Sequence, residues 1–128
     1  MRLSEKTIAC AKASRFTYQR GDLTAGIVHL GVGAFHRAHQ AIYVDDILAS
    51  SPDWAIVGAS LRSKTAALAL NPQDGLYSLT INAASGSSSR IVGSVLEVVD
   101  ASLQSETLLQ RMVDPAIRIV SLTITEKG

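Results

Sequence analysis

The chain has 128 residues, of which 47% are hydrophobic and 18% charged, and its formal net charge is +1. This length suits one compact domain with a sizeable core. The near-neutral charge argues against a nucleic-acid-binding protein, which is usually clearly basic. The sequence has no apolar run of the roughly eighteen residues that span a membrane. With one cysteine and no signal-peptide pattern, the protein is predicted to be cytoplasmic.

Hydrophobic patterning predicts alternating helices and strands in the first half of the chain. Phe35, Ala38 and Ile42 lie on one helical face, and Ser4 and Ser63 suit the N-cap positions of short helices. In chain order, the expected elements are a helix at 4–13, a strand at 27–31, a helix at 34–50, a strand at 54–59 and a helix at 64–70.

The second half is predicted to contain a hairpin, a helix and a last strand. The Ser- and Gly-rich stretch at 83–89 is expected to be a mobile loop, longer than the tight hairpin turns. The expected elements are strands at 76–82 and 90–99, a helix capped by Asp100 or Ser102 that runs to about residue 113, and a strand at 117–125. The last strand is expected to place five side chains in the core, namely Ile117, Ile119, Val120, Leu122 and Ile124.

The order of these elements predicts the fold class. Near-continuous apolar strands that alternate with helices are typical of a mostly parallel sheet with helices on both faces. We therefore expect an α/β protein, with a mostly parallel sheet and an inserted β-hairpin.

A pair of glycines connects the first predicted strand to the next helix. Gly31 permits a tight turn, Gly33 lets the backbone approach a pyrophosphate closely, and the helix start offers free N–H groups to phosphates. The full G-x-G-x-x-G pattern would have a third glycine where this chain has His36. Two glycines also occur in ordinary strand-to-helix turns, so the spacing alone leaves a nucleotide site and a plain turn as alternatives.

A longer motif around this turn points to one family. Residues 31–48, GVGAFHRAHQAIYVDDIL, resemble the start of the long-chain mannitol dehydrogenase and fructuronate reductase family, whose hallmark is G-x-G-x-F-H-R-A-H-Q. Residues 117–128, IRIVSLTITEKG, resemble a second family segment, and TEKG is closest to the fructuronate reductase branch. The resemblance implies an NAD(P)-binding, Rossmann-like domain over 26–128, preceded by an N-terminal helix and lead-in over 1–25.

The resemblance also implies what the intact protein does. The family interconverts mannitol and fructose, or mannonate and fructuronate, by hydride transfer to and from NAD or NADP. The polyol or sugar acid and the catalytic lysine, with its asparagine and histidine partners, belong to a C-terminal domain. We therefore expect no catalytic residue here, and a chain that is incomplete relative to the two-domain fold. Such a chain would expose apolar surface that favours self-association. The alternative is a stand-alone, non-catalytic nucleotide-binding module or a truncated product.

The expected cofactor contacts come from three segments. His36 and Arg37 fall in the first helical turn, where a cation opposes the helix dipole unless it meets an anion such as a bound phosphate. The alternative for Arg37 is a solvated side chain or a pair with an acid of the same domain. The turn and the resemblance together predict contacts from Gly31, Val32, Gly33, Ala34, Phe35, His36, Arg37, Arg62, Lys64, Thr65, Thr123 and Thr125.

The end of the second strand bears on the choice of cofactor. NAD-binding Rossmann domains usually have an acidic residue about twenty residues past the glycines. In NAD-using members of the family, the positions that match Lys64 and Thr65 can be acidic. Here residues 58–65 contain no carboxylate but do contain Arg62, so nothing repels a 2′-phosphate. This predicts tolerance of NADP or preference for it, with solvated cations as the alternative.

Other polar residues near the turn are assigned structural roles. His36 and His39 have the spacing of helical metal ligands, but no third ligand of matching character is nearby, so no metal site is predicted. His29 is expected to be a hydrogen-bonded core residue. Asp45 and Asp46 are expected on a solvated helix face.

Overall fold

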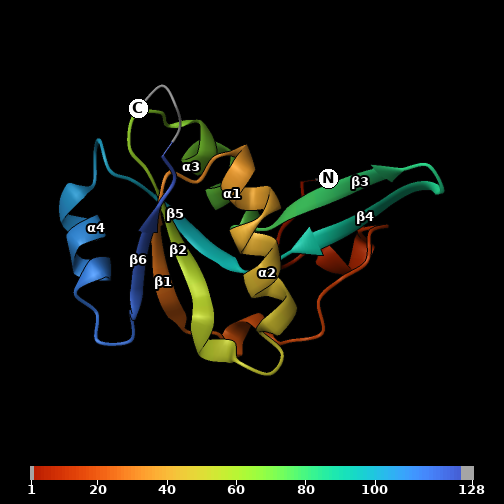
Figure 1. Cartoon of the computed structure of the whole chain (residues 1–128), viewed down its shortest axis with the longest axis horizontal. Helices are drawn as coiled ribbons and strands as arrows, with labels where there is room; N and C mark the ends of the chain where they lie inside the picture. Colours follow the sequence, from red (N-terminus) through yellow and green to blue (C-terminus); the bar gives the residue numbers. More distant parts are fainter. Residues whose placement is uncertain (1, 125–128) are drawn as a thin grey trace.

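A computed structural model describes residues 2–124 of the chain. It contains a four-stranded parallel sheet in the order β5-β2-β1-β6 and a separate antiparallel hairpin (Figure 1). The predicted fold class, α/β with a mostly parallel sheet and an inserted hairpin, is confirmed. The strands of the sheet are β1 (Ala25–Leu30), β2 (Ala55–Ser60), β5 (Val95–Asp100) and β6 (Ile119–Leu122).

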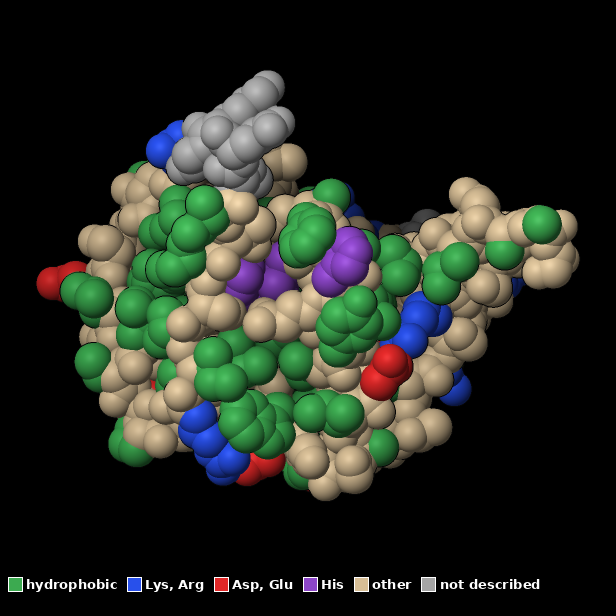
Figure 2. Space-filling model, viewed as in Figure 1, with side chains coloured by type: hydrophobic (Ala, Val, Ile, Leu, Met, Phe, Trp, Pro, Cys, Tyr) green, Lys and Arg blue, Asp and Glu red, His purple; other side chains and the backbone are tan. Residues whose placement is uncertain are grey.

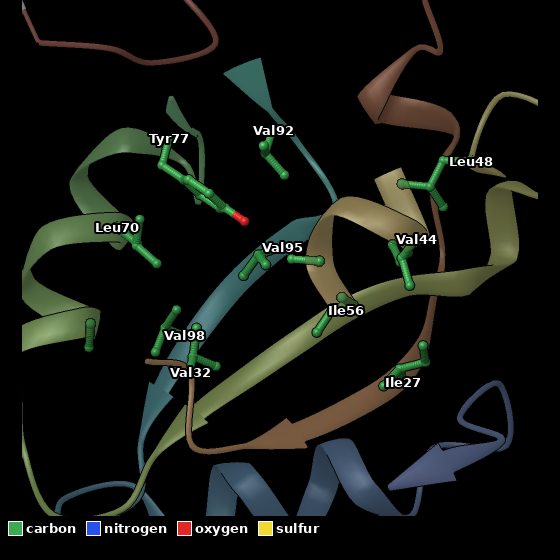
Figure 3. Close-up of a cluster of buried hydrophobic side chains, with 13 residues drawn as sticks. Ile27, Val32, Val44, Leu48, Ile56, Leu70, Tyr77, Val92, Val95 and Val98 are labelled. Carbon is green, nitrogen blue, oxygen red and sulfur yellow. The ribbon is translucent and has the colours of Figure 1, made fainter. Parts of the chain in front are cut away.

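Helices cover both faces of the sheet, and each face has its own hydrophobic cluster. Successive strand residues point to opposite faces, so Ile27 and Val28 enter different clusters. Figure 3 shows the first cluster, which includes Val44 and Leu70 from the helices on that face. Leu108 packs in the second cluster, on the other face. Each fully buried Val or Leu side chain stabilises the fold by about 1.5–3 kcal/mol. The helices are α1 (Ala34–Ala38), α2 (Gln40–Ile47), α3 (Thr65–Leu70) and α4 (Ser105–Met112).

The strand order creates a crevice at one end of the sheet. β2 pairs with one side of β1, and β6 pairs with the other side, both in parallel. The chain first moves outward to β5 and then returns past β1 to form β6. In open α/β sheets, ligands bind outside the carboxyl ends of the strands at the point where the order reverses. Here that point lies between β1 and β6.

The helix predicted at 34–50 is present but is broken at His39. His39 has φ −125° and ψ −90°, so α1 ends before it and α2 begins after it. The Tyr77 hydroxyl donates a hydrogen bond to the carbonyl of Arg37 at 2.5 Å. A side chain that inserts into the helical hydrogen-bond ladder is a known cause of such breaks. The tyrosine also ties the hairpin to the helix that follows β1.

The hairpin differs from the predicted one at its turn. Its strands, β3 (Tyr77–Ala83) and β4 (Gly86–Val92), pair to their ends, so residues 84–85 form a tight turn. The predicted long, mobile loop at 83–89 is therefore wrong. Gly86 has φ +125°, a conformation that residues with a side chain rarely adopt, and this glycine makes the short turn feasible.

Serine hydroxyls and the N-terminal segment support this hairpin. The hydroxyls of Thr80 and Ser89 form a hydrogen bond across the strands at 2.9 Å. The backbone of Ser14 bonds along β4, donating to the Ser89 carbonyl at 3.1 Å and accepting from the Ile91 N–H at 2.8 Å. The predicted strand at 90–99 is divided between the end of β4 and the start of β5.

The N-terminal helix predicted at 4–13 is wrong, because that segment forms one 3-10 turn, Ile8–Cys10. No residue of this turn is buried, so no apolar face would stabilise a longer helix there. The lead-in is instead held by Arg20, whose guanidinium donates to the carbonyls of Asp74 and Val95 at 2.6 and 2.9 Å.

The last strand is less buried than predicted. β6 pairs with β1 along one edge, and no strand among residues 2–124 pairs with its other edge. Ile119, Val120 and Leu122 are 44%, 45% and 54% exposed, and Ile124 is exposed as well, so the expected core is wrong for these four side chains. Ile117 does pack against the second cluster. Self-association through this surface stays a prediction. None of the helices in the described part of the chain is long and apolar enough to cross a membrane.

Candidate functional site

The turn after β1 forms one wall of a cavity. Gly31 has φ +97°, which favours glycine, and a Cβ at this position would lie 3.6 Å from the Cβ of Thr123. Val32 packs on β2, where a Cβ added to Gly58 would lie 2.2 Å from Cγ2 of Val32. A Cβ on Gly33 would meet no atom within 4 Å. Val32 therefore fastens the turn to the sheet, and Gly33 faces open space.

A cavity of about 540 Å³ opens beside this turn, at the carboxyl ends of β1, β2 and β6. Sites for small molecules usually measure roughly 300–1,000 Å³. Among the described residues that line the cavity none is acidic, and two are basic, Arg37 and Arg62. The lining residues are Gly31, Val32, Gly33, Ala34, Phe35, Arg37, Ser60, Leu61, Arg62, Ser63, Thr65, Ala66, Ala69 and Thr123.

Most of the predicted contacts line this cavity. Phe35 is 65% exposed, so it forms a wall of the cavity and does not belong to the core. Lys64 is exposed but lies outside the cavity lining, His36 is turned into the protein, and Thr125 lies outside the described residues. The predicted contacts that the structure brings together are Gly31, Val32, Gly33, Ala34, Phe35, Arg37, Arg62, Thr65 and Thr123.

The sequence analysis missed several lining residues at the end of β2, on α3 and in the loop between them. Ser60 ends β2, and its buried Oγ has no hydrogen-bond partner among residues 2–124. Ala66 and Ala69 lie one turn apart on α3, where their short side chains leave room. The expected parallel pairing of the first two strands could have indicated these residues, because it brings the residues after β2 next to the glycine turn. The missed residues are Ser60, Leu61, Ser63, Ala66 and Ala69.

His36 was expected at the cofactor but lies in the interior, with 1% of its surface exposed. Its ring stacks on that of His29 with 3.8 Å between centroids, and its Nε2 lies 2.7 Å from Oε1 of Gln40. Burial, reinforced by the neighbouring His29, lowers the pKa of His36 to about 4, and the Gln40 hydrogen bond opposes this shift. His36 therefore packs between α1 and the sheet, against His29 of β1, and is uncharged at neutral pH.

The buried His36 predicts a loss of stability in mild acid. The unfolded chain takes up this proton near the ordinary pKa of 6.5 and the folded chain only near 4. The unfolded state therefore binds more protons between these values, and stability falls as the pH drops from 6.5 to 4, by up to about 3 kcal/mol. Urea denaturation between pH 4 and 7.5 measures this slope. His36→Phe, which keeps a stacked ring, should flatten this slope. Equal slopes in the original chain and in the His36→Phe variant would contradict the assignment.

Asp45 was predicted on a solvated face and is instead 4% exposed, whereas the side chain of Asp46 is 55% exposed as expected. The Asp45 carboxylate accepts hydrogen bonds from the Tyr18 hydroxyl, from the Gly93 N–H at 3.0 Å and from Arg90 at 2.7 Å. Burial and this carboxylate raise the pKa of Tyr18 well above its usual range, so the phenol stays a donor. Asp45 thus joins the lead-in, α2 and the hairpin.

His29 is a hydrogen-bonded core residue, as predicted. It is 4% exposed and bonds to the hydroxyls of Ser121 and Thr123, each at 2.7 Å. Within residues 2–124, no three histidine, cysteine or carboxylate side chains are placed to share a metal ion.

The chain is similar to known proteins along most of its length. The family model described as the mannitol dehydrogenase Rossmann domain matches residues 25–128. The chain is 51% identical over 116 residues to the polyol:NADP oxidoreductase of Gluconobacter oxydans (strain 621H), a match that covers 87% of this chain and 24% of that protein. It is 45% identical over 119 residues to the mannitol 2-dehydrogenase of Cereibacter sphaeroides, covering 90% of this chain and 25% of that protein.

Solved structures show the same relationship. A D-sorbitol dehydrogenase in substrate-free form superposes with a TM-score of 0.93 at 45% identity, and the match covers all of this chain and 28% of that one. The Pseudomonas fluorescens mannitol 2-dehydrogenase, in a ternary complex with NAD and D-mannitol, superposes with a TM-score of 0.92 at 37% identity over 27% of its length. The chain spans about a quarter of the length of the curated relatives. It belongs to the mannitol dehydrogenase family, whose Rossmann domain it matches.

Proposed function

We propose that the chain binds NAD or NADP in the cavity beside the glycine turn, as the cofactor-binding domain of a polyol or sugar-acid oxidoreductase. The binding domain spans residues 26–128, and residues 1–25 are its lead-in. One observation carries the proposal: the cavity lies where the strand order reverses and combines the glycine turn with two arginines and no acid among its described lining residues. Such a lining suits a ligand that carries phosphates.

The residues present fit a dinucleotide. The open space at Gly33 and the N–H groups at the start of α1 suit a pyrophosphate, and Phe35 provides an apolar wall. Arg37 crosses the turn, since its Nε donates to the Gly33 carbonyl at 3.2 Å. We assign no direct contact to His36 or Lys64. Thr125 stays in the proposed site on the family resemblance alone.

Arg62 leads us to propose a preference for NADP. It lines the cavity beyond β2, and no acidic side chain within residues 2–124 forms an ion pair with it. A guanidinium there attracts a 2′-phosphate, and no carboxylate in the lining repels it. The name of the Gluconobacter relative, polyol:NADP oxidoreductase, is consistent with this choice.

Calorimetric titration of the chain with NADPH and NADH tests both the binding of a dinucleotide and the preference for NADP. We expect NADPH to bind more tightly, and Arg62→Ala to weaken NADPH binding about tenfold with little effect on NADH. Lys64→Ala is the matched control, because Lys64 has the same charge but does not line the cavity. Much tighter binding of NADH would overturn the cofactor preference alone. Failure to bind either nucleotide would overturn the proposed function.

For the whole protein we propose hydride transfer at a secondary alcohol, with the bound nicotinamide as hydride donor or acceptor. Interconversion of mannitol and fructose is favoured, because several relatives are named mannitol 2-dehydrogenase. Conversion of mannonate rests on the TEKG segment, which lies outside the described residues. An assay of the full-length reading frame with mannitol, fructose, mannonate and fructuronate decides between the two. A cytoplasmic location stays a prediction.

A further inference from the structure

A polar network lies behind the cofactor cavity and shares Thr123 with it. Thr123 also lines a second, smaller pocket of about 270 Å³, which lies between α1 and β6. Figure 2 shows histidine side chains near the middle of the view, with hydrophobic side chains around them. His29 and His36, both almost fully buried, line this second pocket. The pocket thus has a polar interior next to the proposed site.

Side-chain hydrogen bonds join these residues in one series. His36 Nε2 lies 2.7 Å from Gln40 Oε1, and Gln40 Nε2 donates to Ser121 Oγ at 3.4 Å. Ser121 Oγ lies 2.7 Å from His29 Nδ1, and His29 Nε2 lies 2.7 Å from Thr123 Oγ1. The series therefore runs from α1 through β6 and β1 to the wall of the cavity.

The Gln40 amide sets the direction of the first two hydrogen bonds, because its oxygen accepts from His36 and its NH₂ group donates to Ser121. The proton of the Ser121 hydroxyl is then free to point to Nδ1 of His29, and we take the His29 tautomer that accepts it. Burial lowers the pKa of His29, which keeps the ring neutral at neutral pH. A neutral imidazole that accepts at Nδ1 carries its proton on Nε2. His29 therefore donates to Thr123 Oγ1.

We propose that this network makes the Thr123 hydroxyl a hydrogen-bond donor to an acceptor oxygen of the bound dinucleotide, with His29 as its positioning residue. Because Thr123 Oγ1 already accepts from His29, its own proton remains for a ligand. The Thr123 backbone is fixed as well, since its N–H donates to the Leu30 carbonyl at 3.1 Å. Thr123 lies beside Gly31, close to the turn that suits the pyrophosphate. This inference rests on the proposed function and adds a specific donor and its support.

Two substitutions of Thr123 test the donor itself. Thr123→Val removes the hydroxyl but keeps the shape, and it should weaken binding of NADPH or NADH about tenfold in calorimetric titration of the chain. Thr123→Ser keeps the hydroxyl and should stay within about twofold of the original affinity. Both side chains fit a half-buried position, so both proteins should fold. Equal affinities for the Val and Ser variants would overturn the proposal.

Two substitutions of His29 test its positioning role. The amide of His29→Asn reaches the place of Nδ1 and keeps Ser121, whereas that of His29→Gln reaches the place of Nε2 and keeps Thr123. We expect the Asn variant to bind the dinucleotide about fivefold more weakly and the Gln variant to bind nearly as well as the original chain. The Asn substitution should add little in a Thr123→Val background, because both remove the same donor.

The melting temperature of each variant separates positioning from folding. If His29→Asn lowers the melting temperature but leaves the dissociation constant unchanged, His29 is structural and the proposal is wrong. Full additivity of the His29→Asn and Thr123→Val effects would also overturn it. If the unmutated chain binds no dinucleotide, the proposed function itself is wrong. That outcome is distinct from a failure of the present proposal, which is judged from differences between variants of a chain that does bind.

Discussion

Asp45→Asn should lower the free energy of unfolding by about 4 kcal/mol, because it breaks a buried network around one carboxylate. Asp45 accepts from the Tyr18 hydroxyl, the Gly93 N–H and the Arg90 guanidinium. Asparagine keeps the shape but removes the charge and places an NH₂ group where one of these donors needs an acceptor. The loss should appear as a lower urea midpoint with an unchanged slope.

Asp46→Asn is the matched control for this experiment. Asp46 contacts the same Arg90 at 2.8 Å, but its side chain is 55% exposed. An exposed ion pair contributes about 1 kcal/mol or less to stability, so the urea midpoint of this variant should be close to that of the original chain. Similar losses in the two variants would show that burial of Asp45 is not what makes it important.

Gly58→Ala should destabilise the chain by about 3 kcal/mol and weaken dinucleotide binding about tenfold or more. The added Cβ would lie 2.2 Å from Cγ2 of Val32, a branched side chain that has no flexible end to move aside. Val32 must then shift outward and take with it the turn that lines the cavity. Thermal unfolding and calorimetric titration measure the two effects separately.

A second substitution tests this explanation. Val32→Ala removes the clashing methyl group, and in the Gly58→Ala background it should restore much of the dinucleotide affinity. On its own Val32→Ala should cost about 2 kcal/mol of stability through the space it leaves, and the double variant should lose less than the sum of the single losses. Normal binding by Gly58→Ala alone would contradict the role assigned to Val32.

The parallel sheet could be predicted because its signal is local. Ile27 and Val28 point to opposite faces and are both buried, so the strand is apolar at successive positions, as a sheet covered on both sides requires. The tight hairpin turn could not be predicted in this way. The serines at 87–89 are typical of a loop, and they form a strand because β3 on one side and Ser14 on the other supply hydrogen-bond partners.

The buried role of Asp45 depended on contacts that are distant in the sequence. Its partners Tyr18 and Arg90 lie 27 and 45 residues away along the chain. Aspartate residues are mostly exposed to solvent, and Asp45 is followed directly by a second one, Asp46. Helical spacing does place Asp45 on the face of Ala41 and Leu48, but nothing near it in the sequence supplies the partners that a buried carboxylate needs.

The candidate site was predictable at the glycine turn and less so in the helix after it. Ala41 and Val44 define the buried face of α2, and an unbroken helix would continue that face to Arg37. The break at His39 rotates the side chains of α1 relative to those of α2. His36 therefore points into the protein, and Arg37 lines the cavity. Next to the break, the Arg37 carbonyl accepts a hydrogen bond from Tyr77, 40 residues along the chain, and no local pattern contains this contact.

The projecting hairpin in Figure 1 gives this domain a convenient point of attachment. Its strands leave and re-enter the body at Tyr77 and Val92, which are buried, while the turn at 84–85 is exposed. Residues inserted in that turn lengthen the hairpin without altering the order of the parallel sheet. Cys10 is the chain's one cysteine and is also exposed, so Cys10→Ser combined with Ser85→Cys moves the single reactive thiol to the tip. A fluorophore or surface tether fixed there would leave the proposed nucleotide-binding cavity unobstructed.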